Sequence, residues 1–201
     1  MLLYSWVRFV RDGVEVSMSK RAGEFITLDE LLAEVGVDAA RWFFASRAAT
    51  TSIDFDIEQM RGQREALERG DHEEASKMPV YYVQYAHARI ASIVRKASDA
   101  DIAPATSVRG TLDGRPEAAL ARAVVRFPEV VEDAVVGEET QGITAFATEL
   151  ATGFHAFYRD ARVIDAAEPE RSAARLALAR AAQITLARTL GLLGISAPES
   201  M

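Results

Sequence analysis

The sequence predicts a mainly α-helical bundle that is preceded by a short β-hairpin and connecting helices. Three observations support this fold class. Apolar residues recur at helical spacing over most of the chain after Pro79. Glycine and proline clusters divide these stretches into helices of ordinary length. Near the N-terminus, Asp12-Gly13 lies between two β-prone runs, which is typical of a tight hairpin within residues 2–16.

Connecting helices are expected after the hairpin. Thr27 is suited to cap a helix, and Glu30 follows at the spacing of a capping box. This helix is expected to end at Gly36, because glycine favours the backbone geometry that closes helices. Asp38 is then expected to cap a second helix.

The rest of the chain is predicted to form helices separated by turns. Pro79 suits the first turn of a long helix, and Pro128 is expected to kink or split a later one. A charged helix and a short charged stretch are expected on either side of a turn at Arg69-Gly70-Asp71. The helical stretches lie at residues 58–78, 79–97, 120–131, 143–157 and 173–193, with a loop at 98–116.

The sequence suggests two parts, residues 1–56 with the hairpin and connecting helices, and residues 57–201 with the helical bundle. We expect Trp6 and Trp42 to be core residues, since large aromatic side chains contribute most to burial. His87 and His155 are expected to be structural, because neither has a second ligand at metal spacing. No metal site is predicted.

Composition limits the possible functions. The 201 residues carry a formal net charge of −7, which argues against a purely electrostatic nucleic-acid binder but allows a local basic face. There is no cysteine, so neither disulfides nor a cysteine metal site is available. No segment has the length of a membrane span or the pattern of a signal peptide, so we expect a cytoplasmic protein that does not enter the membrane.

A short motif follows the hairpin. Met18-Ser19-Lys20-Arg21 is similar to the mobile signature loop of class I aminoacyl-tRNA synthetases, although Ser17 stands where that loop usually has lysine. In such enzymes, amino-acid activation expels pyrophosphate from ATP, and a loop lysine neutralises the growing charge. The resemblance gives this catalytic role to Lys20 and an ATP-loop role to Met18, Ser19 and Arg21.

Further segments extend the resemblance over nearly the whole chain, which is similar to the C-terminal part of arginyl-tRNA synthetases with its DALR-type anticodon-binding domain. Residues about 60–78 look like an insertion relative to that family. The matching segments are residues 17–44, Asp54-Phe55-Asp56, Pro79 to Arg89, Phe154 to Tyr158, 174–178 and Leu192 to Glu199.

The resemblance also implies what this chain lacks. The family's catalytic domain carries a His-x-Gly-His motif, and none of His72, His87 and His155 lies in such a motif. We therefore expect an excised piece or a truncated homologue that is inactive alone and holds no cofactor. The full-length relative would be an ATP- and magnesium-dependent arginine–tRNA ligase, and this chain would be its anticodon-binding module.

The expected partner is the anticodon loop of arginine tRNA, bound by a monomer. Tyr82, Arg89 and Lys96 are seven residues apart, so they share one helix face on which unpaired bases could stack. For each tyrosine, packing in the core is the alternative. The resemblance places Arg89, Tyr158 and Met201 near the anticodon, and Arg162 could meet phosphates or simply be solvated. The predicted RNA-binding residues are Tyr82, Gln84, Tyr85, Arg89, Lys96, Tyr158, Arg162 and Met201.

Two other functions stay open. A degenerate homologue could use its bundle to dock another protein without tRNA specificity, and the acidic net charge motivates this alternative. An independent enzyme is disfavoured, because the chain has no nucleotide-binding motif of its own. A salt-sensitive preference for arginine tRNA would distinguish a tRNA-binding module from a protein-docking bundle.

Overall fold

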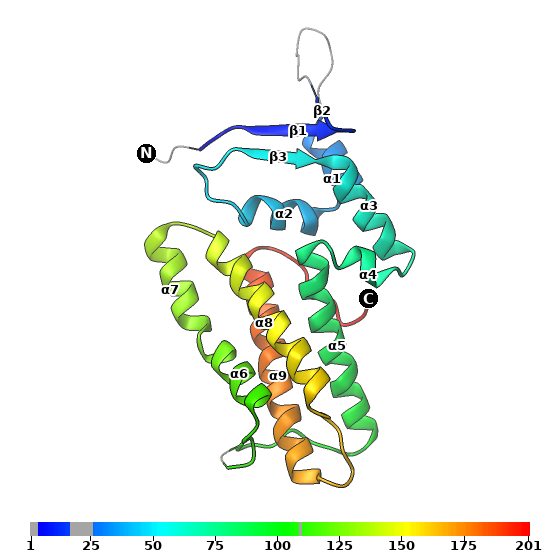
Figure 1. The fold of residues 1–201 in the computed structure, drawn as a ribbon, viewed down its shortest axis with the longest axis vertical. Coiled ribbons are helices and arrows are strands. Elements are labelled where there is room, and N and C mark those ends of the chain that lie inside the picture. The colour runs from blue at the N-terminus through cyan, green and yellow to red at the C-terminus, as the bar shows by residue number, and fades with distance from the viewer. Residues whose placement is uncertain (1–3, 17–25, 109) are drawn as a thin grey trace.

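The computed structural model describes residues 4–16, 26–108 and 110–201 of the chain, and it confirms the predicted fold class. A small three-stranded sheet and short helices lie at one end of a bundle of long helices (Figure 1). Met18, Ser19, Lys20 and Arg21 lie outside the described residues. Among those residues, no helix is both long and apolar enough to cross a membrane.

The sheet has the order β2-β1-β3, formed by β1 (Val7–Arg11), β2 (Val14–Glu15) and β3 (Ile53–Asp56). The predicted hairpin is confirmed, with Asp12 and Gly13 in the left-handed backbone region at its turn. The strand β3 was not predicted, and it pairs parallel to β1. Parallel partners are brought together by a long connection, so no local turn signal marks them.

Four short helices join the sheet to the bundle: α1 (Leu28–Val35), α2 (Val37–Ala45), α3 (Ile57–Glu68) and α4 (His72–Ala75). The capping box of Thr27 and Glu30 is confirmed. The prediction that Asp38 caps α2 was wrong, because Gly36 occupies the cap and Asp38 already lies in the first turn. The Asp38 carboxylate instead binds groups from other parts of the chain.

The two tryptophans differ in environment. Trp42 is 4% exposed in the core, as predicted, whereas Trp6 is 85% exposed. Trp6 lies directly before β1, the strand that pairs with both β2 and β3. The prediction for Trp6 was therefore wrong, because hydrophobicity alone does not say which face of a strand is covered.

The bundle consists of α5 (Pro79–Asp99), α6 (Arg115–Val125), α7 (Phe127–Gly137), α8 (Gln141–Asp160) and α9 (Pro169–Leu192). α8 and α9 pack between α5 on one side and α6 on the other (Figure 1). The predicted break at Pro128 is confirmed by the change from α6 to α7. Each fully buried large side chain, such as Phe154 or Leu186, contributes about 1.5–3 kcal/mol.

One hydrophobic core runs through the helices and reaches the strands β1 and β3, while β2 stays exposed. It runs from Leu31 on α1 through Phe55 on β3 and Ile90 on α5 to Ile195 beyond α9. α3 packs against α1 and β1 as well as α4. The predicted boundary between residues 1–56 and 57–201 thus falls within packed structure, and it stays a prediction.

Candidate nucleic-acid interface

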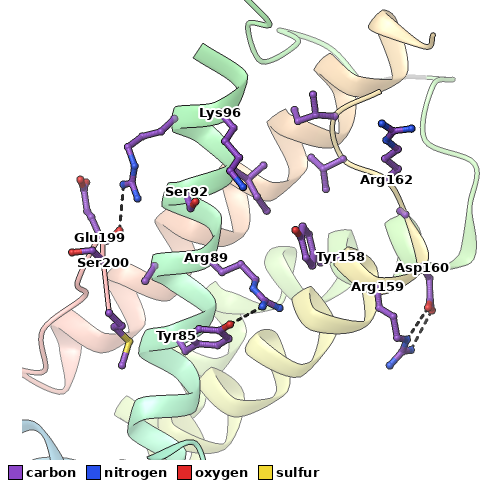
Figure 2. Close-up of a pocket in the computed structure, with 17 residues that line it drawn as sticks. Tyr85, Arg89, Ser92, Lys96, Tyr158, Arg159, Asp160, Arg162, Glu199 and Ser200 are labelled. Carbon is purple, nitrogen blue, oxygen red and sulfur yellow. Dashed lines mark hydrogen bonds and ion pairs between the residues drawn. The ribbon is translucent and has the colours of Figure 1, made fainter. Parts of the chain in front are cut away.

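A cavity of about 820 Å³ opens between α5, the end of α8, the segment that follows α8, and the end of the chain (Figure 2). Five cationic side chains line it and face two carboxylates, although the whole chain is acidic. A site with an excess of positive charge suits a polyanion. The cations are Arg89, Arg95, Lys96, Arg159 and Arg162, and the carboxylates are Asp160 and Glu199.

Arg89 lies between two tyrosine rings at the edge of this cavity. Its guanidinium carbon is 4.8 Å from the ring centre of Tyr85 and 5.2 Å from that of Tyr158. Arg89 Nη2 also donates to the Tyr85 hydroxyl at 2.6 Å (Figure 2). These contacts hold a planar cation beside aromatic rings, an arrangement on which an unpaired base can stack.

The spacing of residues on α5 explains the cavity wall. Tyr85, Arg89, Ser92 and Lys96 follow one another at intervals of three or four residues, so they project from one side of the helix. The structure therefore brings Arg89 and Lys96 together as their shared spacing predicts. Sequence reasoning missed Ser92, for which this same spacing was an available signal.

Tyr82 lines a second hollow of about 500 Å³ that shares Tyr85, Arg89 and Tyr158 with the first. Its hydroxyl donates to Thr152 Oγ1 at 3.3 Å, and its ring centre lies 4.9 Å from that of His155. The Tyr82 ring therefore combines packing with partial exposure. The two hollows form a continuous surface on either side of Arg89.

His155 lies among these rings and supports them. Its ring centre is 5.9 Å from that of Tyr85, which in turn stacks on His72 at 5.5 Å. Burial, with a smaller contribution from the charge of Arg89, lowers the pKa of His155 from 6.5 to about 4. His155 is therefore neutral at physiological pH, and its role in packing agrees with a structural histidine.

Two further cations, Arg159 and the predicted Arg162, are exposed around the cavity. Arg159 pairs with Asp160 at 2.8 Å, and this hydrogen bond lowers the pKa of the Asp160 carboxyl. Arg162 lies 3.6 Å from Asp165, at three quarters exposure. Such exposed pairs contribute little to stability, so their cations are available to exchange partners for phosphate.

Gln84 and Met201 occupy different positions relative to the cavity. Met201 lines it, together with Ser200 and Glu199 from the end of the chain. Gln84 is only 4% exposed, and its amide donates to the carbonyl oxygen of Ser196 at 3.0 Å. The structure thus places Gln84 behind the cavity wall, and its contact with RNA stays a prediction.

Within residues 4–16, 26–108 and 110–201, no group of three histidine or carboxylate side chains converges as metal ligands would. Residues 17–25, which include Lys20, lie outside those ranges. The described site combines stacking surfaces with positive charge.

The chain is similar to known arginine–tRNA ligases. The family model described as the DALR anticodon binding domain matches residues 83–201. The arginine–tRNA ligase of Geobacillus thermodenitrificans is 41% identical over 97% of this chain and 33% of that protein. That of Citrifermentans bemidjiense is 44% identical over 100% of this chain and 35% of that protein. The chain thus spans about a third of the length of these relatives.

The fold agrees with the sequence comparison. The solved arginyl-tRNA synthetase of Thermus thermophilus superposes with a TM-score of 0.74 at 26% identity, covering 98% of this chain and 35% of the other. The predicted resemblance to arginyl-tRNA synthetases is confirmed by these matches. Since the family model matches more than half of the 201 residues, this chain belongs to the DALR anticodon-binding domain family.

Proposed function

We propose that the chain binds the anticodon loop of arginine tRNA, as the RNA-binding module of an arginine–tRNA ligase. The observation that carries the proposal is the Arg89 guanidinium held between Tyr85 and Tyr158 at the edge of a cationic cavity. Anticodon bases are unpaired and can be splayed onto such surfaces. Each stacked base contributes about 1–3 kcal/mol.

The charge distribution supports RNA over a protein partner. An acidic net charge of −7 motivated the alternative of a protein-docking bundle. The cavity itself carries the opposite charge, with Arg89 and Lys96 on its α5 wall and Arg162 on the segment that follows α8 (Figure 2). Phosphates of an RNA loop that enters the cavity would meet these cations while its bases meet the rings.

We also propose roles that depend on the rest of such a ligase. Lys20, with Met18, Ser19 and Arg21, would act on ATP and magnesium only beside a catalytic domain, which supplies the nucleotide site. The chain alone would be an inactive, monomeric binder in the cytoplasm, where tRNA is charged. Residues 57–201 would form its anticodon-binding domain.

The deciding experiment is a binding titration with two RNA hairpins. One is the anticodon stem-loop of arginine tRNA, and the other differs from it only in the middle anticodon base. We expect tighter binding of the unaltered stem-loop, because a shaped pocket discriminates bases that plain charge attraction does not. Equal affinity for the two RNAs, or no binding, would contradict the proposal.

A further inference from the structure

The end of the chain forms one wall of the cavity, and it leaves the bundle in a defined direction. We call residues 194–201 the tail. Gly194 has a φ of +65°, and the amide of Ile195 donates to the carbonyl of Leu190 at 3.0 Å. Ile195 is then buried at 4% exposure. The turn at the end of α9 and the buried Ile195 together direct the tail along α5.

Buried polar side chains of α5 bind the tail backbone. Gln84 Nε2 donates to the carbonyl oxygen of Ser196 at 3.0 Å. His87 Nδ1 lies 2.8 Å from the carbonyl oxygen of Pro198, and since a carbonyl only accepts, Nδ1 carries the proton. Gln84 and His87 are 4% and 5% exposed, and loss of the bond from His87 to Pro198 would leave a buried N–H group unpaired.

Asp38 joins this network from a distant part of the chain. Its Oδ1 accepts from the amide of Ser196 at 3.2 Å, across 158 residues of sequence. Its Oδ2 accepts from Gln84 Nε2 at 2.8 Å and from the Ser196 hydroxyl. One carboxylate thus binds both the tail and the α5 side chain that holds the tail.

These contacts lie on the side of the tail away from the cavity. Asp38 and Gln84 line a different hollow of about 590 Å³, on which Ser200 and Met201 also border. Ser200 and Met201 line the cationic cavity as well. The tail is therefore a thin wall between two hollows, and its position on the RNA side depends on hydrogen bonds made on the other side.

We propose that Asp38, Gln84 and His87 are positioning residues for anticodon selectivity, which act on RNA only by holding the tail. This inference rests on the proposed function. A wall that moves by a fraction of an ångström accepts more than one base, whereas a wall fixed in advance accepts the base that fits it. Loss of the network should therefore reduce discrimination between bases more than it reduces affinity for RNA.

The test uses the same pair of stem-loops and the ratio of their two dissociation constants. In Asp38→Ala we expect this ratio to fall about fivefold or more, the effect of one or two lost hydrogen bonds, of which the one to Gln84 is part-buried. Asp38→Asn keeps an acceptor oxygen and should recover part of the ratio. Asp29→Ala, which removes an exposed carboxylate from the first turn of α1, is the matched control and should leave the ratio unchanged.

A deletion separates positioning from general damage. Removing residues 200–201 should lower the ratio in the wild type and add nothing in Asp38→Ala, because both changes act through the tail. Ser196→Ala, which removes only a hydroxyl from an exposed residue, offers a milder variant if Asp38→Ala unfolds. Equal weakening of both RNAs, or an unchanged ratio in every network variant, would overturn the positioning role.

Amide exchange without RNA distinguishes failure of this inference from failure of the proposed function. We expect the Ser196 amide to exchange slowly in the wild type and faster in Asp38→Ala. If the wild type does not discriminate the two stem-loops, the proposed function and the role in selectivity both fail, while slow exchange would still show a held tail. If the wild type discriminates but the Ser196 amide exchanges freely, only the positioning role fails.

Discussion

At the scale of single residues, Arg89 is both held in place by its neighbours and accessible from the cavity. Its guanidinium has aromatic rings on two sides, so it is held in one orientation. It also borders both hollows and is accessible from them. A cation that is oriented before RNA arrives loses little conformational entropy on binding.

Arg89→Ala should weaken binding of the arginine anticodon stem-loop by about 5- to 150-fold, the loss of about 1–3 kcal/mol of stacking. Arg89→Lys keeps the charge but not the planar group, and it should recover only a small part of the affinity. Arg122→Ala removes an exposed cation from α6 and serves as the control. Binding by Arg89→Ala as tight as by this control would refute the assignment.

The lowered pKa of His155 predicts a dependence of stability on pH. Because its pKa falls from 6.5 to about 4 on folding, the folded protein resists protonation of a ring buried beside Tyr82, Tyr85 and Arg89. Its contribution to the free energy of unfolding is complete above about pH 6.5 and is lost as the pH falls towards 4.

Urea unfolding of the wild type and of His155→Phe between these pH values tests this expectation. The carboxylates titrate alike in both proteins, so the difference between the two free energies isolates His155. The wild type should lose more stability than the variant as the pH falls. Parallel curves for the two proteins would show that His155 does not make this contribution.

At the scale of elements, the cavity depends on helices that do not line it. Glu117 on α6 is 2% exposed and accepts from Arg175 on α9 at 2.9 and 3.0 Å. Arg175 Nη1 also donates to the carbonyl oxygen of Arg162, in the segment that closes the cavity. The ion pair therefore connects α6, α9 and the cavity wall.

Glu117→Ala should lower the free energy of unfolding by about 3–5 kcal/mol, because it leaves the largely buried Arg175 without its partner. Glu149→Ala breaks a pair with Arg126 of similar length, 2.7 Å, in which both side chains are about half exposed. That control should cost less than about 1 kcal/mol. Chemical denaturation measures both, and similar losses for the two variants would contradict the assignment of a buried pair.

At the scale of the whole molecule, the charges are segregated. Acidic residues gather on α3 and α4, with Glu65, Glu68 and Glu73, and on α7, with Glu132 and Asp133. Cations dominate the cavity at the junction of α5, α8 and the tail. The electrostatic field at the cavity is therefore local, and the net charge of −7 does not describe it.

Stem-loop affinity should accordingly fall with salt. If about three to five phosphates are neutralised, the logarithm of the association constant should fall with the logarithm of salt concentration at a slope of about −2 to −3.5. Titrations over a series of potassium chloride concentrations measure this slope, and Lys96→Ala should reduce its magnitude. A slope near zero would mean that the cavity cations do not contact phosphate.

Local signals were sufficient for much of this fold. Four features arise from the preferences of a few adjacent residues. They are the Asp12-Gly13 turn, the capping box at Thr27, the start of α5 at Pro79 and the break at Pro128. The seven-residue spacing on α5 likewise placed Arg89 and Lys96 on one wall. Such features follow from backbone geometry, so the sequence by itself determined them.

Contacts between distant segments were decided by the tertiary structure. Three features depend on which segments meet. They are the parallel pairing of β3 with β1, the exposure of Trp6, and the hydrogen bond of Asp38 to Ser196 in the tail instead of to its own helix end. The sequence predicts that Gln84 contacts RNA, yet the structure buries its side chain behind the wall of the cavity. Burial and long-range hydrogen bonds are properties of packing, and no local pattern of residue types encodes them.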